Sequence, residues 1–176
     1  MISLATLVRD TFAPQLQSMA QWLDKGAEHA NAKGLSLEAL LEARLAPDMF
    51  PLATQVVVAC HHAYDGPARL MGQTPPATFE QRNWRFDELK ARTAAAVRHV
   101  EGLDPAAFGG AAERRVVVPL MAGMVLEMDG AAFLQRWTFA HFYFHTVTTY
   151  DILRSQGVEL GKRDFVGHLL PFIRQA

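Results

Sequence analysis

Apolar residues recur at helical spacing along four long stretches of the chain. From Ile2 to Lys33 an apolar side chain returns every three or four residues, and Lys33-Gly34 is a typical helix stop. The same period predicts long helices from Pro51 to Gly72, from Phe86 to Leu103 and from Gly130 to Gln156. Segments rich in proline and glycine separate these stretches. The pattern therefore predicts an all-α protein, a four-helix bundle.

A different pattern precedes the last long stretch. Two short segments containing valine and other apolar residues, 115–120 and 124–128, flank Met121-Ala122-Gly123, which predicts a small β-hairpin with Pro119 at an edge. Short helices are predicted from Leu37 to Ala46 and near Phe165 to Ile173. The expected fold is a four-helix bundle with a small β-hairpin before the last long helix, and residues 1–176 are expected to form a single domain.

Composition narrows the classes of function. The chain has 176 residues, half of them hydrophobic, and a net charge of −1, so no basic excess favours nucleic-acid binding. No apolar run reaches the roughly 18 residues of a membrane span. The N-terminus lacks the charged start and apolar core of a signal peptide. A single cysteine, Cys60, excludes an intramolecular disulfide, and we expect a cytoplasmic protein without membrane association.

Histidines carry the main chemical signal. His141 and His145 are four residues apart and share one side of the last long helix. On the second long helix, His62 lies about 60° from the centre of the apolar stripe and His61 about 160° away. We therefore expect His62 to border the core and His61 to face outward. The face of the last helix through His145 is polar in its middle, with Leu134, Thr138, His141, Thr148, Thr149 and Ile152.

Three interpretations of this face stay open. His62, His141 and His145 can converge on a divalent metal, with three imidazole nitrogens and an open fourth position. Alternatively, these histidines hydrogen-bond to neighbouring threonines and tyrosines as buried polar groups. In the third interpretation, the polar stripe meets another subunit. A zincin-type protease is a weaker alternative, because such enzymes need Glu directly after the first histidine and Phe142 stands there.

Other candidates are weaker. A lone buried cysteine such as Cys60 usually packs as a small hydrophobic residue. The aromatic residues of the last helix are expected to be packing residues on its flanks: Trp137, Phe139, Tyr143 and Phe144. No partner pattern surrounds His29, His99 or His168. The sequence contains no glycine-rich phosphate loop and no Ser-His-Asp arrangement.

Three segments resemble signatures of one bacterial family of uncharacterised function. They are Ala46-Pro47-Asp48-Met49-Phe50-Pro51-Leu52, His141-Phe142-Tyr143-Phe144-His145 and Gly157-Val158-Glu159-Leu160-Gly161-Lys162-Arg163-Asp164-Phe165. That family is similar to the DinB-like superfamily, also called DinB/YfiT-like metalloenzymes. The segments occur in the right order and extend from the end of the first helical region to the tail.

The resemblance implies a four-helix bundle that is usually dimeric. In metal-binding members of the superfamily, one histidine comes from the second helix and a His-x-x-x-His pair from the fourth. Carried onto this chain, these positions are His62, or His61, together with His141 and His145. In the close family, the position of His141 is often Asn and that of His62 often apolar. A complete triad is therefore a departure from that family.

Two functions follow as expectations. The first is a divalent-metal enzyme, with zinc or nickel, that acts on a small molecule as a thiol transferase or hydrolase through the three-histidine site. The alternative is a non-catalytic dimeric bundle that binds a small ligand or a protein partner without metal. The sequence leaves open whether the protein is an enzyme.

Overall fold

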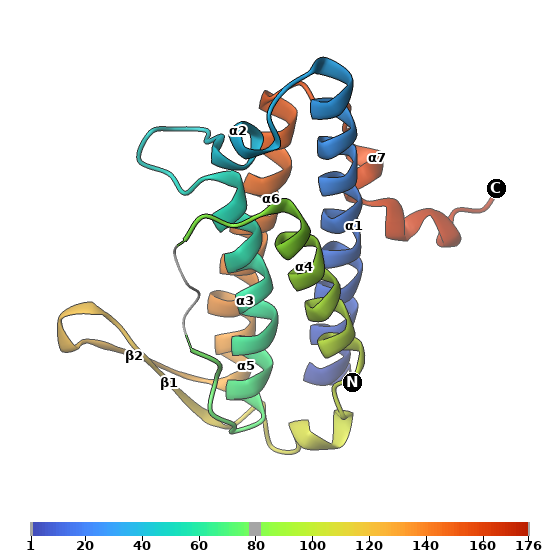
Figure 1. Cartoon of the computed structure of the whole chain (residues 1–176). Helices are drawn as coiled ribbons and strands as arrows, with labels where there is room; N and C mark the ends of the chain where they lie inside the picture. Colours follow the sequence, from blue (N-terminus) through green and yellow to red (C-terminus); the bar gives the residue numbers. More distant parts are fainter. Residues whose placement is uncertain (1, 78–81, 176) are drawn as a thin grey trace.

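Four long helices form the body of the molecule (Figure 1). The computed structural model describes residues 2–77 and 82–175. The long helices are α1 (Leu4–Lys33), α3 (Leu52–Leu70), α4 (Phe86–Glu101) and α6 (Phe139–Ser155). α3 and α4 run in the same direction, and α1 and α6 run opposite to them. α1 packs mainly on α4, and α3 mainly on α6. The predicted four-helix bundle is confirmed.

α1 ends at Lys33, as predicted, and begins at Leu4, two residues after the predicted start at Ile2. Ser3 caps the helix by accepting a hydrogen bond from the Thr6 backbone N–H, and Gly34 ends it in the left-handed conformation. The expected apolar stripe is buried, including Phe12, Leu16 and Met19. α1 also contains Pro14 within the helix.

The short helix α2 (Leu37–Glu42) is capped by Ser36 and ends four residues before the predicted end at Ala46. The early end has a local cause. Ala43 adopts an extended conformation, and its carbonyl accepts a hydrogen bond from the Leu52 backbone N–H at 2.9 Å. The chain therefore leaves the helix to pass beside the start of α3.

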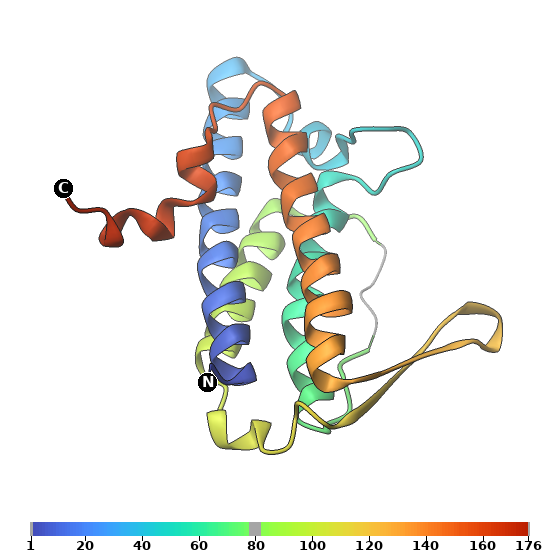
Figure 2. The same ribbon diagram turned by 180° about the vertical axis from the view of Figure 1, so that it is seen from behind.

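The predicted hairpin forms a two-stranded antiparallel ribbon that projects from one end of the bundle (Figure 2). β1 (Arg115–Pro119) and β2 (Val125–Asp129) pair with Val117 opposite Glu127. Arg69 of α3 anchors the ribbon by donating to the Val117 carbonyl at 3.1 Å. Arg114 donates to the Leu70 carbonyl at the end of α3. The base of the ribbon is thus fixed to the helix that carries His61 and His62.

The sequence predicted one continuous helix from Gly130 to Gln156, but this region is not uniform. It begins with α5 (Gly130–Ala132), continues as a π-helical turn (Phe133–Thr138) and only then becomes α6. Such turns insert extra backbone into a helix and occur often at functional sites. The tail also differs from the prediction of one short helix. It contains α7 (Lys162–Phe165) and then a 3-10 helix (Gly167–Phe172).

α7 is held against α1 by two polar contacts. Trp22 donates its indole N–H to the Asp164 carbonyl at 3.1 Å, and Lys25 pairs with the Asp164 carboxylate at 2.6 Å. The Trp22 ring also stacks on Phe165 at 5.2 Å between ring centres. Two further 3-10 segments, Pro105–Phe108 and Met121–Gly123, complete the fold. None of the described helices is both long and apolar enough to cross a membrane.

Candidate functional site

α3 supplies the first part of the histidine cluster and is enclosed on nearly every side. All of its residues except Tyr64 and Arg69 are buried. His62 borders the core, as predicted. His61 does not face outward: it is only 9% exposed, and the expectation for this residue was wrong. Asp65, Arg69 of α3 and Arg92 of α4 lie close enough to influence its charge, so other side chains occupy the side that the helical period assigned to solvent.

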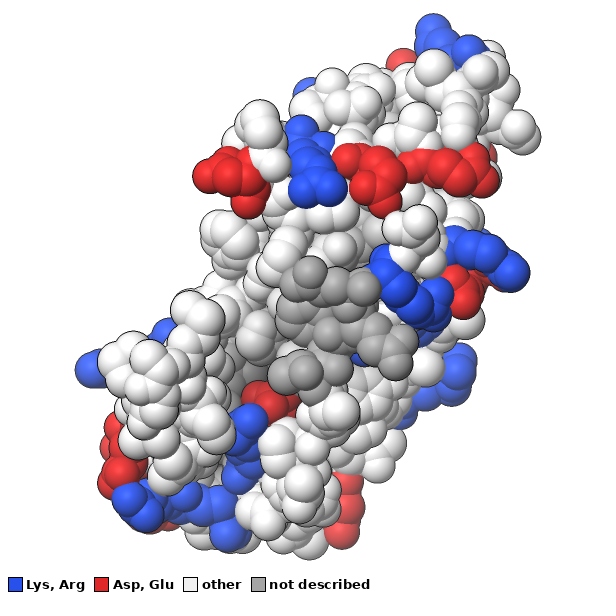
Figure 3. Space-filling model, turned by 60° about the vertical axis from the view of Figure 1, so that its left-hand side comes forward, with Lys and Arg blue, Asp and Glu red and all other residues white. Residues whose placement is uncertain are grey.

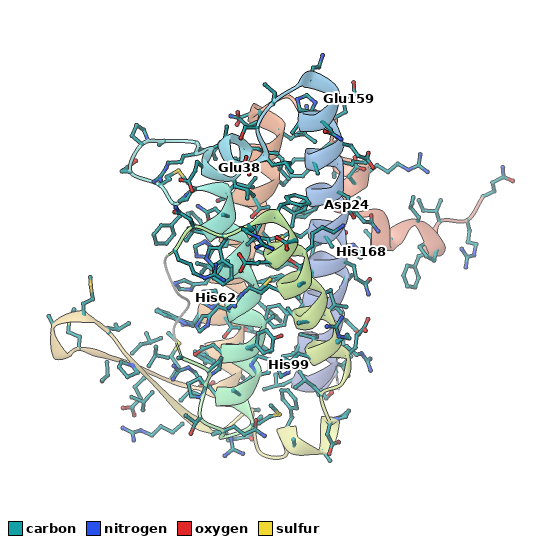
Figure 4. All side chains as sticks on the ribbon, in the orientation of Figure 1. Asp24, Glu38, His62, His99, Glu159 and His168 are labelled. Carbon is teal, nitrogen blue, oxygen red and sulfur yellow. The ribbon has the colours of Figure 1, made fainter. Side chains whose placement is uncertain are left out.

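A close approach of α3 and α6 brings the histidines together. Gly66 lies one turn after His62, and a Cβ atom at this position would overlap the Thr138 methyl group. Only glycine lets the two helices approach this closely. The His62 ring centre consequently lies 5.2 Å from that of His141 and 5.9 Å from that of His145. The structure therefore brings all three predicted site residues into one cluster. Figure 4 shows His62 on α3 and, well separated from it, His99 on α4.

Hydrogen bonds fix which nitrogen of His145 carries the proton. Gln55 donates its side-chain N–H to the Phe50 carbonyl at 3.1 Å, so its carbonyl oxygen faces His145. That oxygen lies 2.7 Å from His145 Nδ1 and can only accept a hydrogen bond. His145 Nδ1 is therefore protonated, and Nε2 keeps its lone pair.

His141 follows the same arrangement. Its Nδ1 lies 2.8 Å from the Trp137 carbonyl, which is also only an acceptor. Neutral His141 therefore holds its proton on Nδ1 and its lone pair on Nε2. The Trp137 ring lies 4.1 Å from the His141 ring and restricts its orientation. Acceptors that hold Nδ1–H in this way are typical neighbours of histidines that bind metals through Nε2.

Burial keeps two rings of the cluster uncharged. Desolvation, reinforced by His141 and His145, lowers the pKa of His62 to about 3. Desolvation, with a contribution from His141, lowers the pKa of His145 to about 4. Both rings are therefore neutral at pH 7 and have lone pairs available. The pKa of His61 is also lowered, mainly by desolvation, although Asp65 opposes that shift.

Two polar atoms on the seam between α3 and α6 are buried without a hydrogen-bond partner among the described residues. They are His62 Nδ1 and Thr138 Oγ1. An unpartnered buried polar group costs about 1–3 kcal/mol, and native proteins usually satisfy such groups with water, an ion or a ligand. The seam therefore contains polar atoms, close to the imidazoles, that a water, an ion or a ligand could satisfy.

The spacing of the three imidazoles suits a bound metal ion, but their present ring orientations do not. Two imidazoles on one tetrahedral ion, with bonds of about 2.1 Å, have ring centres roughly 5 Å apart. The observed 5.2 and 5.9 Å agree with that spacing. However, no three His, Cys, Asp or Glu side chains in ranges 2–77 and 82–175 form a group that could hold a metal ion as they stand. The planes of His62 and His145 are 16° apart in a stacked arrangement, in which the two rings do not aim at one point. Metal binding would require the rings to turn.

Sequence reasoning missed two contributors. Gln55 orients His145, and it lies seven residues before His62, which places both on one side of α3; that spacing was the available signal. Asp65 and Arg69 form a largely buried ion pair at 2.9 Å one turn beyond the histidines. Cys60 behaves as expected: it is fully buried, and burial raises the pKa of its thiol to about 11.

Known proteins resemble the chain in both sequence and structure. Residues 5–166 match a family described as a domain of unknown function, DUF1993. A crystal structure of a DinB family member protein from Shewanella denitrificans is 34% identical, with a TM-score of 0.86 over 98% of this chain and 96% of that chain. No curated protein matches the sequence. The chain belongs to the DUF1993 family and is a DinB-like protein.

Proposed function

We propose that this DinB-like protein binds one divalent metal ion, zinc or nickel, between His62, His141 and His145. The observation that carries the proposal is the proton placement on α6. Gln55 and the Trp137 carbonyl occupy Nδ1 of His145 and His141, so both Nε2 lone pairs remain available. The buried, unpartnered His62 Nδ1 beside them is a third possible donor. Imidazole ligands suit both metals.

The proposed activity is that of a thiol transferase or hydrolase acting on a small molecule. A metal with three protein ligands and an open position lowers the pKa of a bound water or thiol, which supplies a nucleophile at neutral pH. The protein's own contribution is to keep His62 and His145 neutral, through burial, and to orient His145 and His141, through Gln55 and Trp137. Residues 1–176 are proposed to act as one domain, because the long helices share one buried core.

The proposal includes a homodimer in the cytoplasm, with no nucleic-acid or membrane partner. The resemblance to dimeric DinB-like proteins supports the assembly, and the net charge of −1 supports the absence of a nucleic-acid partner.

A metal-free bundle that binds a small ligand is the alternative, and one observation favours it. A mostly apolar groove of about 440 Å³ lies between α2 and the start of α4, lined by residues that include Leu37, Leu41, Trp84 and Phe86. No histidine lines this groove, so it would suit an apolar ligand bound without any contribution from the histidine cluster.

Metal titration decides between the two. Metal-stripped full-length protein would be titrated with zinc and with nickel, with stoichiometry and thermal unfolding as readouts. We expect about one ion per chain and a raised Tm, because a ligand that binds only the folded state stabilises it. His145→Ala should abolish both effects, whereas His29→Ala on α1 should leave them intact. Absence of uptake in the wild-type protein would refute the metal site and favour the alternative. If the wild-type protein does take up metal, the metal-bound protein would be screened for thiol transfer and hydrolysis.

A further inference from the structure

The outer side of α6 is apolar and exposed. Tyr143, Phe144 and Val147 are 38%, 57% and 39% exposed, and Ala140 beside them is also exposed. Tyr143 and Phe144 each contact one neighbouring ring of the helix, as expected of packing residues on its flanks, but both remain exposed. In Figure 2, α6 lies in front, and no other described segment crosses its outward side. A continuous exposed apolar stripe of this kind marks an interaction surface.

A charged residue stands at each end of the stripe. Arg136 precedes it, in the π-helical turn, and Asp151 follows it. Both are exposed, and neither has a hydrogen bond or ion pair with another residue in the described ranges. At about 100° per residue, Ala140, Tyr143, Phe144, Val147 and Asp151 fall within roughly 100° of the helix circumference. The stripe with its two charges forms one surface, which we call the α6 stripe.

The α6 stripe is complementary to itself. Its midpoint lies between Tyr143 and Phe144. A twofold axis at that point, with a second α6 running antiparallel, places Arg136 opposite Asp151 of the second copy, and Ala140 opposite Val147. A parallel arrangement in register would instead place like charges together. In a twofold dimer each such contact occurs twice, so the charges contribute two attractive pairs.

We propose that two copies of this chain pair through the α6 stripe in an antiparallel dimer. The inference rests on the homodimer in the proposed function and names its surface. A crossing of about 20° keeps the helix ends close enough for arginine to reach the opposite carboxylate. One helix pair is smaller than the usual 20–30 residues per side of a stable interface. Met121, Met124 and Val125 on the β-ribbon are exposed as well, and Figure 3 shows Lys and Arg beside Asp and Glu on this side of the molecule, so no large patch of one charge opposes pairing.

The dimer would also shield the histidine cluster. The Phe144 ring packs edge-on against His145, with ring centres 5.1 Å apart. A second copy that covers Phe144 therefore covers one side of the cluster and helps to exclude water from it.

Charge reversal and its rescue test this surface. The dimer dissociation constant of the full-length protein would be measured by sedimentation equilibrium at low and high salt. We expect Arg136→Asp and Asp151→Arg each to weaken the dimer at least about tenfold at low salt, because each creates two like-charge pairs. The double variant restores opposite charges and should recover most of the affinity. Val147→Glu should weaken the dimer at any salt. Arg98→Asp, a matched change on the exposed side of α4, should have no effect.

The outcomes separate this inference from the proposals on which it rests. A monomeric wild-type protein at micromolar concentration would overturn both the α6 stripe and the proposed homodimer. A dimer that tolerates Val147→Glu and both charge reversals would overturn the α6 stripe alone. Failure of the double variant to recover affinity, with both single variants weakened, would overturn the antiparallel pairing. Circular dichroism verifies that each variant is folded, and metal uptake is measured independently.

Discussion

Gly66 on α3 packs against Thr138, the last residue of the π-helical turn before α6, so closely that any side chain at position 66 would overlap the threonine methyl group. This contact lies one turn from His62 and at the junction between the π-helical turn and α6. The spacing between the two helices that carry the histidines therefore depends on a residue without a side chain.

Gly66→Ala should destabilise the protein and separate the histidines. The added methyl group forces α3 and α6 apart, at a cost of about 1–3 kcal/mol in the free energy of unfolding. Urea unfolding measures the loss. Gly167→Ala is the control, because a Cβ there meets nothing within 4 Å. Adding Thr138→Ser, which removes the methyl group in the way, should recover part of the stability; no recovery would show that another contact sets the spacing.

Gln55 should control metal affinity through the proton on His145. Gln55→Leu removes the acceptor of Nδ1–H, so we expect affinity for zinc to fall about 10- to 100-fold. Gln55→Glu keeps an acceptor and should preserve or strengthen binding. Competition titration against a chromogenic chelator gives both values, with the exposed Gln21→Leu as control. Equal affinity in the two Gln55 variants would contradict this role.

Acid should destabilise the metal-free protein well before carboxylates titrate. The folded-state pKa values of His62 and His145, about 3 and 4, lie below the usual histidine value of about 6.5. The unfolded chain therefore binds more protons below pH 6.5, and stability is complete above that pH and falls as the pH drops towards 4. Each histidine accounts for a loss of about 2 kcal/mol at pH 5.

Urea unfolding in EDTA at pH 7 and pH 5 measures this loss. His62→Leu should reduce the difference between the two pH values, because the variant has one fewer buried imidazole to protonate. A stability that does not change between pH 7 and pH 5 would mean that the rings are hydrated or charged in the folded protein.

Arg69→Ala should lower the free energy of unfolding and loosen the attachment of the β-ribbon to α3. The Asp65 and Arg69 side chains are only 9% and 16% exposed, so removing the arginine leaves a buried carboxylate without its partner. Loss of one member of a buried pair costs about 3–5 kcal/mol. Hydrogen exchange should also accelerate in β1, where Arg69 holds the Val117 carbonyl. Arg115→Ala breaks the exposed pair with Glu127 and should have little effect; equal losses in both variants would contradict the anchoring role.

The sequence predicted the helices and the histidine set because both depend on periodicity. The burial of the apolar stripe of α1 and the proximity of His62 to His141 and His145 follow from positions along regular helices. The burial of His61 was not predicted, because it depends on tertiary contacts that helical periodicity does not reveal. A helical period gives the direction of a side chain, but not which other segment lies there; His61 is buried, and Arg92 of the neighbouring helix α4 lies close enough to influence its charge.

Tertiary contacts account for the remaining differences. The early end of α2 depends on the Ala43 carbonyl meeting the Leu52 N–H across a loop, which no local pattern encodes. Tyr143 and Phe144 were assigned to packing because large aromatic residues usually are buried, whereas both are exposed on α6. The role of Gln55 needed the distance to His145 to be known.

The π-helical turn at Phe133–Thr138 contains one residue more than a regular α-helix would need directly before the histidine pair. A relative lacking a single residue there could keep an unbroken α-helix without disturbing α6 itself. The preceding segment would then rotate by about 100° relative to α6. The ribbon that leads into that segment would change direction with it, while His141 and His145 kept their places. A length difference of one residue between relatives at this point should therefore change the direction of the β-ribbon and leave the imidazoles in position.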